Sequence, residues 1–181
     1  MKGVGELRSI RDDELDLMRS WRNHPSIRAN MYTRHEIGVE EHRAWWESTR
    51  QRSDRKYFMY EVSGVAAGIV GFTAIDQQSR NACWAFYAAP DAPRGTGSRM
   101  EFLALEYAFH DLKLNKLYCE VLAFNVPVIK LHKKFGFQEE GIFRQQHRVD
   151  NDFVDVHRLG ILASEWAALR STMSAKIIAI S

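Results

Sequence analysis

A short basic stretch in the second half of the chain decides the fold: residues 125–137, which read NVPVIKLHKKFGF. The pattern predicts one helix, because Asn125 is a good N-cap, Pro127 is tolerated in a first turn and Gly136 suits a left-handed stop. At about 100° per residue, His132 falls on the same side as the aliphatic and aromatic side chains, and the three lysines fall on the other side. His132 therefore belongs to the apolar arc of this helix and not to its lysine face.

Two interpretations of His132 stay open at this point. It is either a core histidine with a satisfied hydrogen bond, or a partly buried imidazole that faces a cleft. In a cleft, burial favours the neutral ring and makes it suitable for proton transfer. The lysines likewise form either a solvated face or a contact surface for the phosphates of a nucleotide-like ligand.

A glycine-containing loop precedes the longest expected helix, residues 97–112. It reads Arg94-Gly95-Thr96-Gly97-Ser98 and follows an expected strand over residues 81–90. Two glycines let the backbone approach a ligand closely, and the N–H groups at a helix start favour phosphate or pyrophosphate. The loop is not a P-loop, since no lysine follows Gly97, and it lacks the third glycine of a dinucleotide fingerprint. An ordinary glycine-rich turn is the alternative.

The order of elements along the chain predicts a mixed sheet. Strands are expected over residues 6–10, 56–62, 66–76, 81–90, 116–124 and 153–162, and further helices over 12–23 and 39–52 and from residue 164. The run of three strands indicates an antiparallel meander, and the later strand-helix-strand alternation indicates some parallel pairing. With no repeat or linker, one domain is expected over residues 1–174. The tail, residues 175–181, is a last strand, a packing segment or a cloning remnant.

Composition narrows the class of protein. The 181 residues are 45% hydrophobic and 27% charged, with a net charge of +2, which is ordinary for a globular domain and too mild for bulk nucleic-acid binding. Cys83 and Cys119 match no metal-ligand spacing and no disulfide framework, so we expect no metal and a reducing, cytoplasmic location. No apolar run reaches the length of a membrane span, so no membrane partner is expected.

Two motifs together carry a family resemblance. The first is the strand followed by R-G-x-G and a long helix, and the second, some thirty residues on, is EVLAFNVPVIKLHKKFGFQEEG. The pair closely resembles the GNAT family of acetyl-CoA-dependent N-acetyltransferases, over most of the chain. The resemblance implies an α/β (α+β) fold of the GNAT type: a twisted, mixed, mostly antiparallel sheet, flanked by helices. The sheet is expected to splay between two central parallel strands, here residues 81–90 and 116–124.

The resemblance also implies an acyltransferase with acetyl-CoA as cosubstrate, its pantetheine arm held in the splay. The cofactor-binding residues expected are Arg94, Gly95, Thr96, Gly97, Ser98, Val121, Leu122, Asn125, Lys130 and Lys133. The chain departs from the family pattern at two positions. Arg99 stands where the loop pattern ends in glycine or alanine, and His132 stands where a tyrosine commonly protonates the leaving thiolate.

The N-terminal part points to an acceptor. Residues 20–46, SWRNHPSIRANMYTRHEIGVEEHRAWW, resemble the branch that acetylates the 4-amino group of UDP-linked 4-amino-4,6-dideoxy sugars in pseudaminic acid biosynthesis. The resemblance implies a UDP-amino sugar as partner and a site of Arg22, His24, Met31, Tyr32, His42, Trp45, Thr73 and Tyr87. Ordinary core packing is the alternative for each aromatic residue. A homodimer is compatible with the fold, although no interface signal marks one.

A mechanism follows as a hypothesis. An amine attacks a thioester only as the free base, so Glu120 is expected to remove a proton, directly or through a water. A backbone N–H of Val121 or Leu122 would stabilise the oxyanion, and His132 would protonate the thiolate. The alternatives are a ribosomal-protein, antibiotic-modifying or other small-amine acetyltransferase, and a non-catalytic acyl-CoA-binding module.

Overall fold

A computed structural model describes residues 3–179 of the chain. The strands are β1 (Glu6–Ser9), β2 (Lys56–Val62), β3 (Val65–Asp76), β4 (Asn81–Ala88), β5 (Lys116–Leu122), β6 (Gln138–Val149) and β7 (Asp152–Leu162). The helices are α1 (Leu15–Asn23), α2 (Pro25–Arg28), α3 (Val39–Arg50), α4 (Thr96–Glu106), α5 (Val126–Lys134) and α6 (Ala163–Ile178). Two short helical turns, η1 (Asp12–Glu14) and η2 (Tyr107–Asp111), precede α1 and extend α4.

One sheet unites the seven strands in the order β1-β2-β3-β4-β5-β7-β6. The first four strands form an antiparallel meander, and β5, β7 and β6 pair antiparallel on the other side. Among the strands formed by residues 3–179, only β4 and β5, at the centre, run parallel. The expected mixed, mostly antiparallel sheet with a central parallel pair is therefore confirmed.

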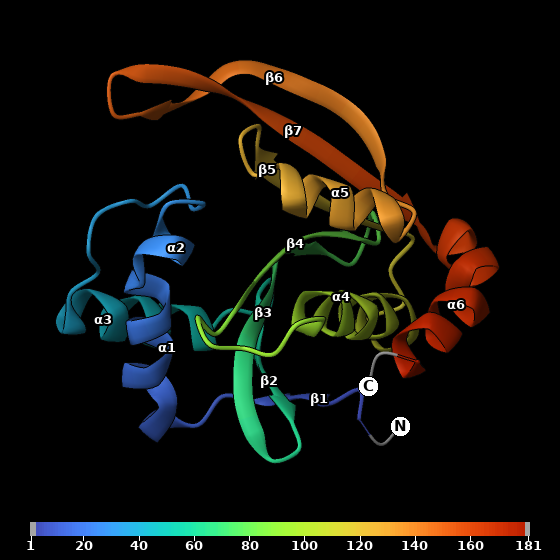
Figure 1. The fold of residues 1–181 in the computed structure, drawn as a ribbon, viewed down its shortest axis with the longest axis horizontal. Coiled ribbons are helices and arrows are strands. Elements are labelled where there is room, and N and C mark those ends of the chain that lie inside the picture. The colour runs from blue at the N-terminus through green and yellow to red at the C-terminus, as the bar shows by residue number, and fades with distance from the viewer. Residues whose placement is uncertain (1–2, 180–181) are drawn as a thin grey trace.

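The central pair separates soon after it forms. The β4–β5 ladder runs only from Asn81↔Lys116 to Cys83↔Tyr118. Beyond it, β4 stays paired with β3 as far as Ala88, and β5 stays paired with β7 as far as Leu122. The facing edges of residues 84–88 and 119–122 thus diverge, and their backbone groups have no partner across the gap (Figure 1).

Helices cover both faces of the sheet, with α1, α2 and α3 on one side and α4, α5 and α6 on the other (Figure 1). Neighbouring strand residues point to opposite faces, so Met59 and Ile69 join the core beneath α1 and α3, while Tyr60 and Val70 join the larger core beneath α4 and α6. The gap between β4 and β5 is consequently reached from both faces.

Local sequence rules explain the helices nearest the gap. Helix α1 ends at Asn23, as expected before the His24-Pro25 pair, and Pro25 then opens α2. Helix α5 ends before Gly136, whose φ of 97° and closeness to Leu169 exclude a Cβ. The predicted faces of α5 are confirmed, since His132 is buried and its three lysines are exposed.

Two features differ from the sequence expectations. No strand was expected over residues 138–149, where β6 forms a long hairpin with β7. Helix α6 also runs past the expected domain end at residue 174, with Ile177 buried in the core. Within the expected tail, residues 175–178 continue this helix, and residues 180–181 lie outside the described part.

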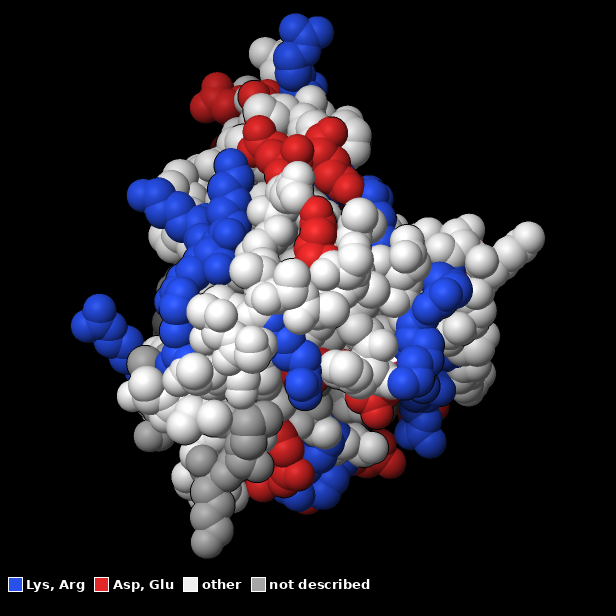
Figure 2. All heavy atoms as spheres, turned by 90° about the vertical axis from the view of Figure 1, so that its right-hand side faces the viewer, with Lys and Arg blue, Asp and Glu red and all other residues white. Residues whose placement is uncertain are grey.

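The surface carries both signs of charge. Figure 2 shows lysine and arginine side chains interspersed with acidic ones over one face, with broad uncharged areas between them. Within residues 3–179, no helix is both long enough and apolar enough to cross a membrane.

Candidate active site

A cavity of about 270 Å³ occupies the gap between β4 and β5, and we call it the splay cavity. It is lined by Ser26, Ile27, Asn30, Met31, Tyr32, Trp84, Ala85, Phe86, Tyr87, Ala88, Cys119, Glu120, Val121, Leu122, Asn125, Val128 and His132. Part of this lining comes from α5 on one face of the sheet and part from residues 26–32 on the other. The cavity therefore joins the two faces, and its lining brings together five of the residues expected at the site: Glu120, Val121, Leu122, Asn125 and His132.

Glu120 is held by two partners at the splay. Tyr32 donates its hydroxyl to Oε2 at 3.1 Å, and Arg158 on β7 donates to Oε1 at 3.2 Å. Burial and the Glu120 charge raise the pKa of Tyr32, so this hydroxyl keeps its proton. The side chain of Glu120 is 32% exposed, which leaves the carboxylate open to an incoming amine or a water.

His132 is buried, yet it lines the splay cavity. Its Nδ1 lies 2.9 Å from Oε1 of Glu101, and the ring packs edge-on against Trp84 and Phe86. The ring thus has a hydrogen-bond partner in the core and is also part of the cavity wall. With Nδ1 engaged, Nε2 is the atom left to meet a group in the cavity.

Glu101, which the sequence analysis did not single out, is fully buried on α4. Burial raises the pKa of its carboxyl group, and the nearby His132 opposes that shift. A sequence signal existed: Glu101 shares a helix face with Gly97, Leu105 and Ala108, and the last two are fully buried. An acid on the buried face of an apolar helix needs a partner, which here comes from α5.

The glycine loop lies at the start of α4. Gly95 is the N-cap with φ 91°, and a Cβ on Gly97 would lie 3.4 Å from Leu131, so the small residues turn the chain and bring α4 close to α5. None of the loop residues lines the splay cavity or the second cavity, which lies on the other side of β4: Arg94, Gly95, Thr96, Gly97 and Ser98. At the other helix start, Asn125 makes no side-chain capping bond, so its amide is open to the cavity.

The two lysines expected at the cofactor lie outside both cavities. Lys130 is exposed, and Lys133 pairs with Glu139 at 3.3 Å. Arg99, the departure in the loop motif, is buried within α4.

A second cavity, of about 310 Å³, lies between β2, β3 and β4 and the helices α1 and α3, and we call it the acceptor cavity. It is lined by Met18, Arg22, Met31, Thr33, Ile37, Glu41, His42, Trp45, Tyr57, Ile69, Gly71, Thr73, Ala85, Phe86 and Tyr87. Four of these residues (Met31, Ala85, Phe86 and Tyr87) also line the splay cavity. The two cavities therefore adjoin across β4.

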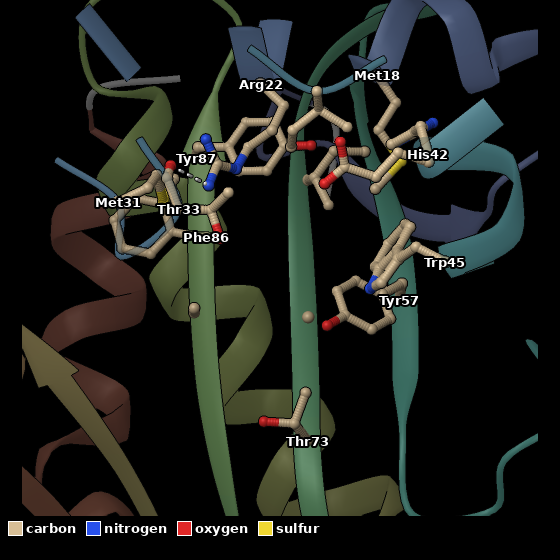
Figure 3. A pocket seen from close by; sticks show the side chains of 15 residues that line it. Met18, Arg22, Met31, Thr33, His42, Trp45, Tyr57, Thr73, Phe86 and Tyr87 are labelled. Atoms are coloured by element: carbon tan, nitrogen blue, oxygen red, sulfur yellow. Dashed lines mark hydrogen bonds between the residues drawn. The ribbon is translucent and has the colours of Figure 1, made fainter. Parts of the chain in front are cut away.

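Two polar groups in the acceptor cavity lack a protein partner. Arg22 donates from Nη2 to the Thr33 carbonyl at 3.0 Å, but its Nη1 and the Tyr87 hydroxyl are buried without a hydrogen bond (Figure 3). Burial raises the pKa of Tyr87, so its hydroxyl stays a donor at neutral pH. Buried donors without acceptors cost free energy, so these two donors are suited to a ligand or a water that brings acceptor atoms.

Aromatic side chains form another wall of the acceptor cavity. His42 stacks on Trp45 with ring centroids 5.3 Å apart, and Trp45 meets Tyr57 edge-on. Burial lowers the pKa of His42, and the Arg19 charge adds to this effect, so the ring is neutral near pH 7. Figure 3 places Thr73 at the end of the cavity opposite Arg22.

The structure brings together most of the residues predicted for the acceptor. Arg22, Met31, His42, Trp45, Thr73 and Tyr87 line the acceptor cavity, and Tyr32 lines the splay cavity. His24 lies in neither, because it caps α2 through Ser26. The sequence analysis missed Met18, Thr33, Tyr57 and Arg158, which ordinary helix and strand patterns do not distinguish.

Neither metal nor thiol chemistry is evident in the described chain. Within residues 3–179, no three His, Cys, Asp or Glu side chains are grouped to hold a metal ion. Both cysteines are free, and burial raises the pKa of Cys83 to about 11 and that of Cys119 well above its ordinary value. The thiols are therefore protonated near neutral pH.

Comparisons with known proteins agree with this geometry. A family model described as "Acetyltransferase (GNAT) domain" matches residues 6–138, which is more than half of the chain. The chain is 32% identical over 137 residues to the acetyltransferase PseH of Campylobacter jejuni (strain 81-176), covering 76% of this chain and 83% of that protein. It is also 26% identical over 162 residues to the spermidine N(1)-acetyltransferase of Escherichia coli K12, covering 89% of this chain and 82% of that protein.

A solved structure shows the same fold. The spermidine N-acetyltransferase of Vibrio cholerae, in complex with CoA and spermine, superposes with a TM-score of 0.83 at 24% identity. The match covers 89% of this chain and 96% of that one.

Proposed function

The chain belongs to the GNAT family and is an acetyl-CoA-dependent N-acetyltransferase, and we propose that its acceptor is the 4-amino group of a UDP-linked 4-amino-4,6-dideoxy sugar. The relatives named PseH support this acceptor, and the spermidine acetyltransferases support a polyamine as the second candidate. A cytoplasmic location, as expected from the sequence, fits such a reaction.

The charge of the acceptor cavity is the observation that carries the proposal. A polyamine is a polycation, and carboxylates are the side chains that neutralise its charges. The lining holds one, Glu41, which already pairs with His35 at 2.9 Å. Arg22 instead offers a buried guanidinium with a free donor, and Tyr87 offers a hydroxyl. Such donors suit the oxygen-rich, anionic character of a nucleotide-linked sugar.

The aromatic wall supports the same acceptor. Trp45, Tyr57 and His42 present flat faces and a neutral ring nitrogen, which suit the apolar side of a deoxy sugar together with one of its hydroxyl groups. The acceptor cavity adjoins the splay cavity across β4. An amine held at this junction would meet Glu120 and Tyr32.

The chain also fits acetyl-CoA, which supplies the activated thioester carbonyl when bound. The facing edges of residues 84–88 and 119–122 carry backbone groups without ladder partners, as an extended arm requires. The amide of Asn125 and the start of α4 at Gly95 lie on the same side of the sheet as α5. We assign the anionic end of the ligand to Arg94, Gly95, Thr96, Gly97 and Ser98, with Lys130 and Lys133 as outer contacts.

Glu120 and His132 divide the proton transfers in the proposed reaction. Glu120, exposed in the splay and fixed by Tyr32 and Arg158, takes the proton from the attacking amine. Val121 and Leu122 line the splay cavity, and the backbone N–H of one of them, on the edge that faces β4, would stabilise the oxyanion. His132 gives a proton to the departing sulfur.

An acceptor panel tests the proposal. CoA release is measured with a UDP-4-amino-4,6-dideoxy sugar, spermidine, an aminoglycoside and a peptide with a ribosomal-protein N-terminus. We expect the amino sugar to give the highest kcat/KM. A higher kcat/KM for spermidine would overturn the acceptor assignment, and no turnover with any amine would favour the non-catalytic module.

A further inference from the structure

We propose that Glu101 is a positioning residue that holds His132 as a proton donor toward the splay cavity, in place of the tyrosine hydroxyl common in this family. The inference rests on the proposed role of His132 in thioester cleavage. It does not rest on the identity of the acceptor, since any accepted amine releases the same thiol.

The contact geometry is specific. Glu101 on α4 is 0% exposed, and its Oε1 lies 2.9 Å from Nδ1 of His132 on α5. Trp84, Phe86 and Phe137 pack around the ring and fix its plane. With Nδ1 bound on one side, the ring lines the splay cavity on the other. An unpaired buried carboxylate costs several kcal/mol, so the pair explains why an acid is tolerated in the core.

A proton count shows what the pair does. When Glu101 and His132 are together neutral, one proton lies between Oε1 and Nδ1, on either atom, and a second proton lies on Nε2. Both arrangements therefore present an N–H donor to the cavity. Desolvation favours the neutral pair over the pair with a net negative charge, because the Glu101 carboxyl group is buried.

The proposed step moves one proton from Nε2 of His132 to the departing sulfur. As the amine nitrogen bonds to the acetyl carbon and the tetrahedral intermediate collapses, the carbon–sulfur bond breaks and its electron pair goes to sulfur. The Nε2–H bond breaks and a sulfur–hydrogen bond forms. The proton between Glu101 and the ring then resides on Nδ1, which leaves a neutral imidazole beside an ionised carboxylate. Glu120 takes the amine proton, and solvent restores both groups.

Other charged or titratable groups face the pair. The positive charge of Lys134 on α5 opposes the rise that burial causes in the pKa of Glu101. The Glu101 charge adds to the effect of burial in raising the pKa of Cys119 on β5. Glu120 shares the cavity with His132. Lys134 and Glu120 must therefore stay unchanged in every variant compared below.

The first test needs no turnover. Long-range ¹H–¹⁵N spectra of the free enzyme report which ring nitrogens carry protons, and the His132 signals are assigned by their loss in His132→Tyr. We expect Nε2 to carry a proton in the wild type, and the ring-nitrogen signals of His132 to change in Glu101→Gln because the carboxylate on Nδ1 is replaced by an amide. A wild-type ring whose Nε2 carries no proton, or the same ring-nitrogen signals in both proteins, would overturn the proposal.

The second test is a double-mutant cycle on CoA release with the best amine of the panel. We expect Glu101→Gln to lower kcat by ~10-fold or more, leave KM for acetyl-CoA unchanged and move the alkaline limb of the pH profile to lower pH. His132→Tyr brings its own hydroxyl donor, so Glu101→Gln in that background should change kcat by less than about 3-fold. Equal losses in both backgrounds would show that Glu101 acts only as a packing residue.

A matched control separates positioning from folding. Glu106 lies on the same helix and accepts hydrogen bonds from Trp166 and Arg170, far from the cavity lining. Glu106→Gln should lower the melting temperature without moving the pH profile. A change in the acceptor preference alone would refute the proposed acceptor and leave the Glu101 assignment untouched.

Discussion

Two buried histidines, one in each cavity, show how differently the same side chain is used. His132 is 2% exposed and His42 is 4% exposed, so burial does not distinguish them. Nδ1 of His132 lies 2.9 Å from the buried carboxylate of Glu101. His42 instead stacks on Trp45, and burial together with the Arg19 charge lowers its pKa. The carboxylate partner suits His132 to the proposed proton transfer, and the neutral ring of His42 suits the proposed recognition of the acceptor.

The largest expected effect comes from removing the proton carrier. We make His132→Phe in the Glu101→Gln background, so that no buried carboxylate is left without a partner. Loss of the acid should lower kcat by ~10²–10⁴-fold with little change in KM for the acceptor. Steady-state CoA release gives both constants. His42→Phe is the control, and we expect it to raise the acceptor KM while kcat changes much less. A kcat loss confined to His42→Phe would reverse the two assignments.

Removal of the base should cost about 10²-fold in kcat, at the lower end of the range for a positioned acid or base. Glu120→Gln keeps the size of the side chain and its hydrogen-bonding capacity toward Tyr32 and Arg158. The amine must then lose its proton to solvent, so activity should recover as the pH approaches the pKa of the acceptor amine. A kcat that stays near wild type at pH 7 would exclude Glu120 as the base.

The recognition side is probed by Arg22→Met, which removes the guanidinium and keeps much of the aliphatic packing. A hydrogen bond to a charged group contributes about 1.5–3 kcal/mol, so the acceptor KM should rise roughly 10- to 100-fold. KM for acetyl-CoA should not change, because Arg22 lines only the acceptor cavity. Spermidine turnover is the counter-test, since it should rise or stay constant when a cation is removed. A parallel loss for both amines would argue against an anionic acceptor.

Local sequence patterns predicted the burial of His132 but not its partner. The stretch over residues 125–137 has a clear helical period and a glycine after the last turn, so the burial of His132 follows from local rules. The partner of His132 lies 31 residues earlier on another helix, and no local pattern shows that two helices bring the pair together. Glu101 is marked only by its place on an apolar face.

Strand β6 was missed for a different reason. Most of its side chains are exposed, and its register with β7 shifts between Glu139 and Gly141 and again between Phe143 and His147. Exposure removes the apolar alternation that identifies a strand, and the shifts break the period of two. Pairing with β7, and not the sequence of β6 itself, makes it a strand. Arg158 lies on β7, a strand that was expected, but its pairing with Glu120 joins residues 38 positions apart, which no local pattern shows.

The smallest effect expected is on stability, and it comes from His42. Burial holds the pKa of His42 in the folded protein below its ordinary value, whereas the unfolded chain keeps the ordinary one. Between those two values the unfolded chain binds more protons, so stability rises with pH across this window and falls as the pH drops through it. Each unit by which the pKa is lowered corresponds to about 1.4 kcal/mol. Denaturant unfolding of the wild type and His42→Gln at pH 7 and pH 5 measures the difference. The variant should lose less stability between the two pH values than the wild type, and an equal loss would mean that His42 is solvated or paired in solution.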